Sequence, residues 1–228
     1  MNTTLSMNDR MKAQFIETGL TAAMTLPSAN RLMECATFTT AAPRQKLFHE
    51  GDRARQFFSV VTGYVRLFRQ NSDGREADIR ICGPGDTFGA ELVFAGNIWT
   101  YDAEAADKAM LVSFDLEKVR EIAAGDDGSF ARAIAASVSA ELQDARDCIA
   151  GDRLNTALQR VAHYLIEQCP GGASPQTFRL ACRKSLLAGK LGLAPEALSR
   201  AFATLKTLGV HVQGRTIEIT DIEALKAL

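Results

Sequence analysis

The chain has 228 residues, of which 46% are hydrophobic and 23% charged, a composition that supports a packed core and excludes a disordered chain. No stretch approaches the ~20 uninterrupted apolar residues of a membrane span, and the first residues lack the apolar core of a signal peptide. We therefore expect a cytoplasmic protein with no membrane partner. The five cysteines are scattered, odd in number and without CxxC spacing, which argues against a disulfide framework and a zinc ribbon.

The net charge of −1 hides an uneven distribution along the chain. Residues 152–228 contain 10 basic and 6 acidic residues, whereas residues 1–151 contain 16 basic and 21 acidic ones. A basic C-terminal third is compatible with nucleic-acid binding in that part of the chain.

The first half of the chain is expected to combine short helices with many short strands. Asn8 and Ser28 are typical N-caps, which predicts helices at Asp9–Ile16 and Ala29–Cys35. Farther along, apolar runs alternate with turns rich in Gly and Asp, and the expected strands are Lys46–Phe48, Phe57–Val61, Tyr64–Arg69, Ala77–Cys82 and Ala109–Phe114. Many short strands at near-regular spacing predict a sandwich or a rolled barrel.

Helical periodicity replaces the strand pattern after residue 128. Between Ser129 and Ala150, apolar residues recur every three or four positions and form one stripe along a helix ~33 Å long. The members of the stripe are Phe130, Ile134, Val138, Leu142, Ala145 and Ile149. The stripe can lie against the helix's own domain or form a dimer seam, and periodicity alone leaves both readings open.

The basic third begins near Gly151-Asp152, where we expect a domain boundary. It is expected to contain a helix at Asn155–Gln168, a loop at Pro170–Pro175 and a β-hairpin at Val210–Thr220.

Two short helical patterns flank a tight turn between residues 184 and 202. Ala188 is small enough to let two helices cross closely, and Gly192 permits the positive φ that reverses the chain. Pro195 suits the first turn of the second helix, and Leu198 faces inward between the helices. The pattern predicts a helix-turn-helix, whose second helix places its N-terminal side chains on base edges in the major groove.

The outward side chains of this second helix are the candidate base readers. Arg200 can donate two hydrogen bonds to guanine, Glu196 can accept one from cytosine, and Ser199 is compatible with several base edges. Lys184 and Arg215, the latter in the hairpin that forms a wing, are the candidate contacts to the DNA backbone. Such contacts supply affinity and no sequence reading.

The order of β-roll, long helix and winged helix-turn-helix resembles the cyclic-AMP receptor protein/FNR family of bacterial transcription regulators. The resemblance covers residues 20–225, and its most specific marks are Glu50-Gly-Asp52, Gly83–Glu91 and Pro195–Arg200. It implies an α+β fold with a cyclic-nucleotide-binding-like, effector-sensing roll at residues 1–128, a dimerisation helix at 129–151 and a winged helix-turn-helix at 152–228. It also implies a homodimer that binds double-stranded DNA and works with RNA polymerase, which favours the dimer seam as the role of the stripe.

Within the family, Glu196, Ser199 and Arg200 resemble the FNR branch, which implies TTGAT-like half-sites in an inverted repeat. Half-sites one helical turn apart, ~34 Å, require a two-fold symmetric dimer. Ala194 departs from the family, which usually has a hydroxyl residue there to cap the second helix. Loss of such a cap costs ~1 kcal/mol.

The segment Gly89–Ala105 resembles the family's phosphate-binding cassette and departs from it at one decisive position. The arginine that pairs with the cyclic phosphate falls at Trp99, and Trp cannot neutralise a phosphate. We therefore expect that cyclic AMP is not the ligand. The candidate effector pocket comprises Phe88, Glu91, Trp99, Thr100 and Tyr101, although its aromatic members could equally be plain core.

The cofactor is left open by the sequence. An iron–sulfur cluster of the FNR kind is not expected, because only Cys35 precedes the roll and Cys82 is alone inside it. Haem, as in the nitric-oxide-sensing DNR type, would need an axial ligand from His49, His163 or His211. No metal site is expected.

An enzyme is not expected either, because the chain has no phosphate-binding glycine loop, nucleophile elbow or zinc helix signature. A cyclic-nucleotide-binding regulatory module is the remaining alternative. The sequence leaves open the effector, activation or repression, the target genes, DNA binding without effector, and a redox role for Cys182.

Overall fold

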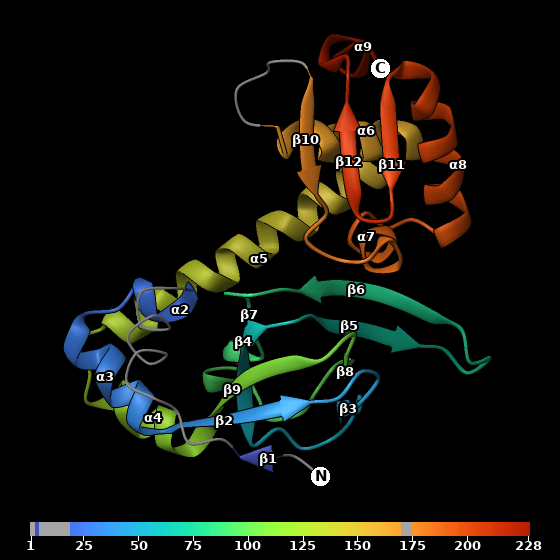
Figure 1. The fold of residues 1–228 in the computed structure, drawn as a ribbon. Helices are drawn as coiled ribbons and strands as arrows, with labels where there is room; N and C mark the ends of the chain where they lie inside the picture. Colours follow the sequence, from blue (N-terminus) through green and yellow to red (C-terminus); the bar gives the residue numbers. More distant parts are fainter. Residues whose placement is uncertain (1–2, 5–18, 170–174) are drawn as a thin grey trace. The chain divides into compact units, whose positions relative to one another are not determined.

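The computed structural model describes residues 3–4, 19–169 and 175–228, and its contacts divide the chain into two compact units, residues 1–143 and 144–228 (Figure 1). This division falls inside the long helix α5 (Ser129–Leu154), which contributes to both units. The helix expected at Asp9–Ile16 lies outside the described residues. Among the described residues, no helix is both long and apolar enough to cross a membrane.

The first unit is built on two antiparallel sheets. In the first sheet the strand order is β1 (Thr3–Thr4), β2 (Ala36–Ala41), β9 (Ala109–Asp115), β4 (Gln56–Thr62) and β7 (Thr87–Phe88). In the second it is β3 (Lys46–Phe48), β8 (Asp102–Ala105), β5 (Val65–Gln70) and β6 (Glu76–Cys82). The five strands expected from the sequence are confirmed, each to within one residue, and the roll and the α+β class are confirmed with them.

Four strands of this unit were not expected from the sequence, and the two longest of them are β2 and β8. Strand β2 lies where only short helices were expected, and it pairs in register with β9, with Phe38 opposite Val112. Strand β8 has the sequence Asp-Ala-Glu-Ala, and its two alanines are fully buried. Neither strand has the run of large apolar residues that marks a strand in a sequence, so pairing with their neighbours determines them.

Helices α2 (Gly19–Ala22), α3 (Leu26–Glu34) and α4 (Leu116–Ala124) gather at one end of the roll, as Figure 1 shows. The expected N-cap at Ser28, with α3 starting at Ala29, is wrong. The helix begins three residues earlier, at Leu26 after the N-cap Thr25, because Pro27 fits the first turn, where its missing N–H is no loss. Ser28 instead hydrogen-bonds to the carboxylate of Asp126.

The first two turns of α5 belong to the core of this unit, which corrects part of the expected dimer seam. Phe130 and Ile134 are 0% and 2% exposed and pack in the same cluster as the strands. A side chain buried in its own domain has no surface to offer a partner chain. The rest of the stripe is exposed and comprises Val138 (37%), Leu142 (49%), Ala145 and Ile149 (54%).

Asp126 fixes the start of α5. Its carboxylate accepts hydrogen bonds from the Ser28 hydroxyl, from the Ser129 hydroxyl at 3.3 Å and from the Phe130 amide at 2.7 Å. Desolvation raises the pKa of Asp126, but these hydrogen bonds outweigh it and hold the pKa below its ordinary value. The ionised carboxylate therefore ties α3 to α5.

This lowered pKa predicts how stability changes with acid. A group whose folded pKa lies below its unfolded pKa stabilises the fold above the unfolded pKa, about 4 for Asp, and this stability is lost as pH falls through the folded pKa. We expect Asp126→Asn to lower the free energy of unfolding at pH 7 and to flatten its acid dependence below about pH 4. Urea denaturation at several pH values checks this, and an unchanged acid slope would contradict it.

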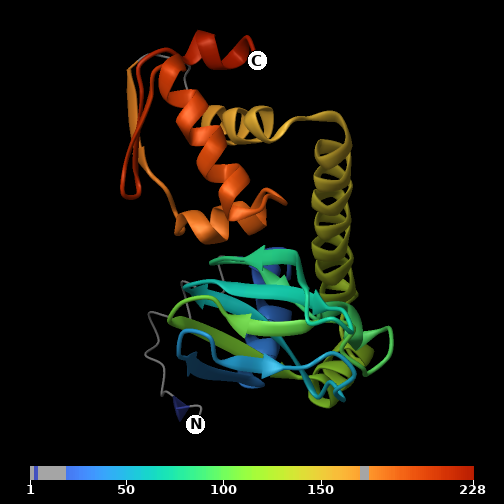
Figure 2. The ribbon, with the colours of Figure 1, turned by 90° about the vertical axis from the view of Figure 1, so that its right-hand side faces the viewer.

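The second unit contains three main helices and a three-stranded antiparallel sheet. The helices are α6 (Ala157–Glu167), α7 (Lys184–Lys190) and α8 (Pro195–Leu205), followed by the turn η2 (Lys206–Leu208) and the short α9 (Ile222–Lys226). The sheet has the order β10 (Gln176–Arg179), β12 (Thr216–Ile219) and β11 (Val210–Gln213). Helix α6 packs against α8 and α9, and Figure 2 shows α6 and α8 crossing, with the sheet to one side.

The expected helix and hairpin of this unit are confirmed with small changes. The helix predicted from Asn155 starts at Ala157, because Thr156 and Gln159 form a capping box. The hairpin forms as β11 and β12, with Gly214 at φ +60° in its turn. Strand β10 was not expected, and residues 170–174 of the expected loop before it lie outside the described residues.

Candidate nucleic-acid interface

The helix-turn-helix is formed by α7 and α8 as the sequence predicts. Gly192 adopts φ +61° in the turn, the left-handed region that favours glycine. Ala188 and Leu198 are both buried where the two helices meet. Pro195 is the first residue of α8.

Helix α8 has one buried and one exposed face. The buried face consists of Leu198, Ala201, Phe202 and Leu205. The three expected base readers, Glu196, Ser199 and Arg200, are all exposed on the first two turns. The arrangement presents a carboxylate, a hydroxyl and a guanidinium together at the N-terminal end of one helix.

The details of these side chains bear on what they can bind. The Ser199 hydroxyl donates to the carbonyl oxygen of Pro195 at 3.0 Å, so its oxygen remains an acceptor. Ala194 is the N-cap of α8 and makes no side-chain cap, as its sequence predicts. The first amide groups of α8 therefore receive no hydrogen bond from a side chain at Ala194. Their N–H groups point out of the N-terminal end of α8.

The two candidate backbone contacts have different surroundings. Lys184 is exposed, and its Nζ lies 5.6 Å from the centroid of the Phe202 ring. The guanidinium of Arg215 donates to the carbonyl oxygens of Leu180, at 2.7 and 3.0 Å, and Ala181. Arg215 thus ties the wing to the segment before α7, and a contact to DNA would have to use its remaining donors.

In the roll, Trp99 occupies the interior of the cassette. The turn η1 (Ala90–Val93) follows Gly89, which adopts φ +79°, and a Cβ at Gly89 would lie 2.4 Å from the Trp99 ring. Trp99 also stacks on Phe48, with ring centroids 3.6 Å apart and an interplanar angle of 7°. Trp99 and Phe88 are buried, so the structure places these two candidates in the core.

Of the other pocket candidates, Thr100 is exposed, whereas Glu91 and Tyr101 are half-buried and form a polar pair. Thr100 is exposed, and its carbonyl accepts a hydrogen bond from Arg69 at 2.9 Å. Burial raises the pKa of the Glu91 carboxyl, and it also raises the pKa of the Tyr101 hydroxyl, which hydrogen-bonds to Glu91. The structure thus keeps only Glu91 and Tyr101 together as a polar pair inside the roll.

A polar contact that the sequence analysis missed connects the roll to α5. Arg80 of β6 lies 3.3 Å from Glu141 of α5 and 3.3 Å from Asp86. The charge of Glu141 also acts on Glu91 and Tyr101. No sequence signal marks these residues, because strand and helix lie 61 positions apart at this contact.

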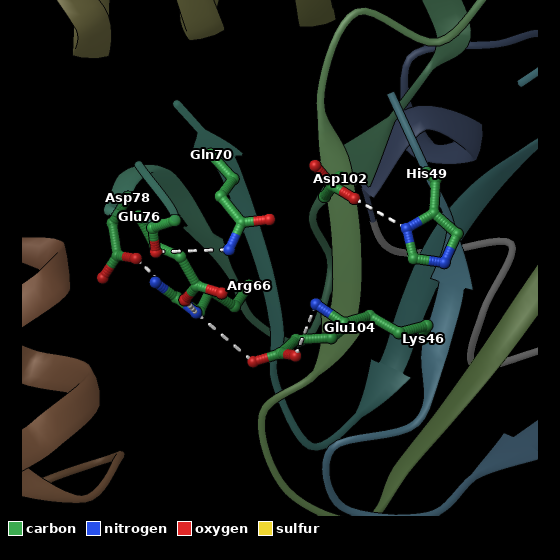
Figure 3. A network of polar contacts seen from close by, with 9 residues as sticks. Lys46, His49, Arg66, Gln70, Glu76, Asp78, Asp102 and Glu104 are labelled. Carbon is green, nitrogen blue, oxygen red and sulfur yellow. Dashed lines mark hydrogen bonds and ion pairs between the residues drawn. The ribbon is translucent and has the colours of Figure 1, made fainter. Parts of the chain in front are cut away.

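A second polar network lies on the sheet formed by β3, β8, β5 and β6. Figure 3 shows Arg66 of β5 between acidic side chains of β6 and β8, at 2.6 Å from Glu76 and 3.4 Å from Glu104, with a further contact to Asp78. Lys46 lies 3.1 Å from Glu104 in the same network. Among the described residues, no group of three or more His, Cys, Asp or Glu side chains is placed to hold a metal ion.

The histidines that could ligate haem all lie on the surface. The Nδ1 of His49 is 2.9 Å from Asp102, and its side chain is 62% exposed (Figure 3). His163 and His211 are exposed as well. Two of the hollows in the first unit have volumes of about 300 and 380 Å³, and both are bordered by Arg53 and Arg55 with no histidine in their lining.

Comparison with known proteins gives the family. Residues 38–126 match the cyclic nucleotide-binding domain, and residues 159–228 match the Crp-like helix-turn-helix domain. The structure of FixK2 from Bradyrhizobium japonicum is 30% identical in sequence, covers 85% of this chain and 96% of its own, and superposes with a TM-score of 0.71. The chain belongs to the CRP/FNR family of transcription regulators.

Relatives with assigned roles agree with this membership. The nitrogen fixation regulation protein FixK of Rhizobium meliloti is 29% identical over 83% of this chain and 85% of its own length. The fumarate and nitrate reduction regulatory protein of Salmonella typhimurium is 24% identical over 81% of this chain and 75% of its own length. As a CRP/FNR regulator, the chain is a DNA-binding transcription regulator and not an enzyme, as the sequence predicts.

Proposed function

We propose that this CRP/FNR regulator binds, as a homodimer, an inverted repeat of TTGAT-like half-sites. The observation that supports this most is the exposed set of Glu196, Ser199 and Arg200 on the first turns of α8. These side chains can pair with base edges in the major groove, where guanine accepts from arginine and cytosine donates to a carboxylate. Recruitment of RNA polymerase at such a site, in the bacterial cytoplasm, is part of the same proposal.

The exposed part of the α5 stripe supports the dimer. Val138, Leu142 and Ile149 are large apolar side chains that lie on one face of a helix and are 37% to 54% exposed. Their spacing of four and seven positions is that of a coiled-coil seam. Pairing of two such helices would bury this stripe and supply the two-fold symmetry that an inverted repeat requires.

Arg200→Ala tests the base-reading role. We expect it to cost ~1–3 kcal/mol on the inverted repeat and to relax base choice at one position. Fluorescence anisotropy on the specific and on a scrambled duplex measures this. Lys184→Ala is the control, because loss of a phosphate contact weakens both complexes alike. Equal weakening of both complexes by Arg200→Ala would make Arg200 a phosphate contact.

We also propose that cyclic AMP does not control this protein. Trp99, packed on Gly89 and Phe48, occupies the interior of the cassette and offers no positive charge to a cyclic phosphate. Titration calorimetry with cyclic AMP is expected to show no binding at millimolar ligand, and the affinity for DNA is expected to stay unchanged. Saturable binding that raises the affinity for DNA would contradict this.

A further inference from the structure

The side chain of Arg160 connects two segments of the second unit that are distant in sequence. Its Nη1 donates to the carbonyl oxygen of Leu191 at 3.0 Å and lies 3.5 Å from that of Gly192, both in the turn between α7 and α8. The same nitrogen pairs with the carboxylate of Asp152 in the last turn of α5. A single guanidinium on α6 therefore links the end of the long helix to the turn that precedes the recognition helix.

The chemistry of the turn explains why a cation is placed there. The carbonyl groups of Leu191 and Gly192 follow the end of α7 at Lys190, where no further helical turn supplies amide donors to them. The Arg160 side chain is only 17% exposed, so it replaces the water that would otherwise bind these carbonyls. The Nε of Arg160 is buried and makes no hydrogen bond, so the contacts of this guanidinium run through its outer nitrogen.

Close packing at Gly192 holds the turn against this ion pair. A Cβ at Gly192 would lie 2.9 Å from a carboxylate oxygen of Asp152 and 3.2 Å from Nη1 of Arg160. The connection on the other side is short, since only Asn155 and Thr156 separate α5 from α6. The turn, α6 and the end of α5 thus form one locally fixed arrangement.

We propose that Asp152 and Arg160 are positioning residues that set the direction of the helix-turn-helix relative to the last turn of α5, and thereby the spacing of the two recognition helices. This inference rests on the proposed dimer on an inverted repeat. Without the pair, each recognition helix can still enter a major groove, but the two are no longer held at the separation of one helical turn that both half-sites demand. Binding to a single half-site does not depend on that separation.

Asp152→Ala is the main test, because it removes an exposed carboxylate and leaves the contacts of Arg160 with the turn. Asp147→Ala is the matched control, since it removes another exposed carboxylate from α5 on the side away from the apolar stripe. Each full-length variant is titrated at fixed salt against the inverted repeat, the same repeat with one extra base pair in its spacer, and a single half-site. Analytical ultracentrifugation verifies that the variants remain dimers.

For Asp152→Ala we expect about a ten-fold loss of affinity for the inverted repeat, a coupling of ordinary size between two sites. We expect its affinity for the single half-site to equal that of the wild type. We also expect the extra base pair in the spacer to reduce its affinity by a smaller factor than it reduces that of the wild type. Asp147→Ala is expected to bind all three duplexes like the wild type. Arg160→Gln, assayed below its melting temperature, is expected to show the same pattern. The variant that carries both Asp152→Ala and Arg160→Gln is expected to bind the inverted repeat no more weakly than the weaker-binding of the two single variants, because both changes break one interaction.

If Asp152→Ala lost affinity equally for the inverted repeat and for the half-site, the positioning role would be overturned. The same holds if Asp152→Ala is a monomer or if it keeps the spacing preference of the wild type. A wild-type protein that binds the inverted repeat no better than the half-site would overturn the proposed function, and the spacing role with it. If the wild type prefers the inverted repeat to the half-site and Asp152→Ala keeps this preference in full, only the spacing role is overturned.

Discussion

Leu142→Glu is expected to separate the dimer into monomers and to reduce affinity for the inverted repeat by at least ~100-fold. Leu142 is 49% exposed in the middle of the α5 stripe, and pairing of two helices would bury one glutamate from each chain in an apolar seam. An unpaired buried charge costs ~3–5 kcal/mol, and every 1.4 kcal/mol is ten-fold in affinity. Analytical ultracentrifugation and anisotropy on the inverted repeat measure the two effects.

Leu154→Glu is the matched control for this prediction. Leu154 lies on the same helix, is 80% exposed and lies about 120° around the helix from Leu142 at ~100° per residue. This control is expected to leave the dimer and its affinity for DNA intact. A Leu142→Glu protein that sediments as a dimer would refute the α5 stripe as the seam.

Phe130→Ala is expected to cost ~3–5 kcal/mol of unfolding free energy, the usual loss when a fully buried phenylalanine leaves a cavity. Phe130 is 0% exposed and packs in the cluster of the roll, two helical turns before the exposed stripe begins. Urea denaturation followed by circular dichroism measures the loss. We expect the surviving folded protein to remain a dimer, because Phe130 faces its own domain.

The opposite result would restore the full stripe as an interface. If Phe130→Ala kept the stability within about 1 kcal/mol, which is the size of an ordinary surface effect, and yet produced monomers, Phe130 would belong to the seam.

These two predictions show what periodicity can and cannot reveal. The three-and-four spacing correctly identified one apolar face of α5 from Phe130 to Ile149. It could not tell which partner covers which part of that face, because a roll and a second helix select the same residue types. The structure divides the face between Ile134, which is buried, and Val138, which is exposed.

The helix-turn-helix was the most predictable part of the fold and of the site. Gly192 and Pro195 each satisfy a backbone requirement of the turn, and Ala188 and Leu198 satisfy its packing, so four independent local features agree. Strand β10 was missed because its four residues gain their structure only from pairing with β12, about 40 positions away.

Contacts between strands that are distant in sequence could not be predicted from the sequence. Trp99 could be predicted to lie in the cassette but not to pack on Gly89 and Phe48, since only the folded roll brings these residues together. The network around Arg66 has the same origin, because it depends on the register of β5 with β6 and β8. The contacts by which Arg160 connects α5 to the turn before α8 could likewise not be predicted.

One binding measurement decides whether this regulator reads an inverted repeat of TTGAT-like half-sites. Fluorescence anisotropy of the purified protein, with a TTGAT…ATCAA duplex and a scrambled duplex, compares the two affinities. The salt concentration must be fixed, because non-specific affinity depends steeply on it. We predict tight binding to the inverted repeat and affinity for the scrambled duplex lower by at least ~1,000-fold. Equal affinity for the two duplexes would show that the protein does not read this inverted repeat.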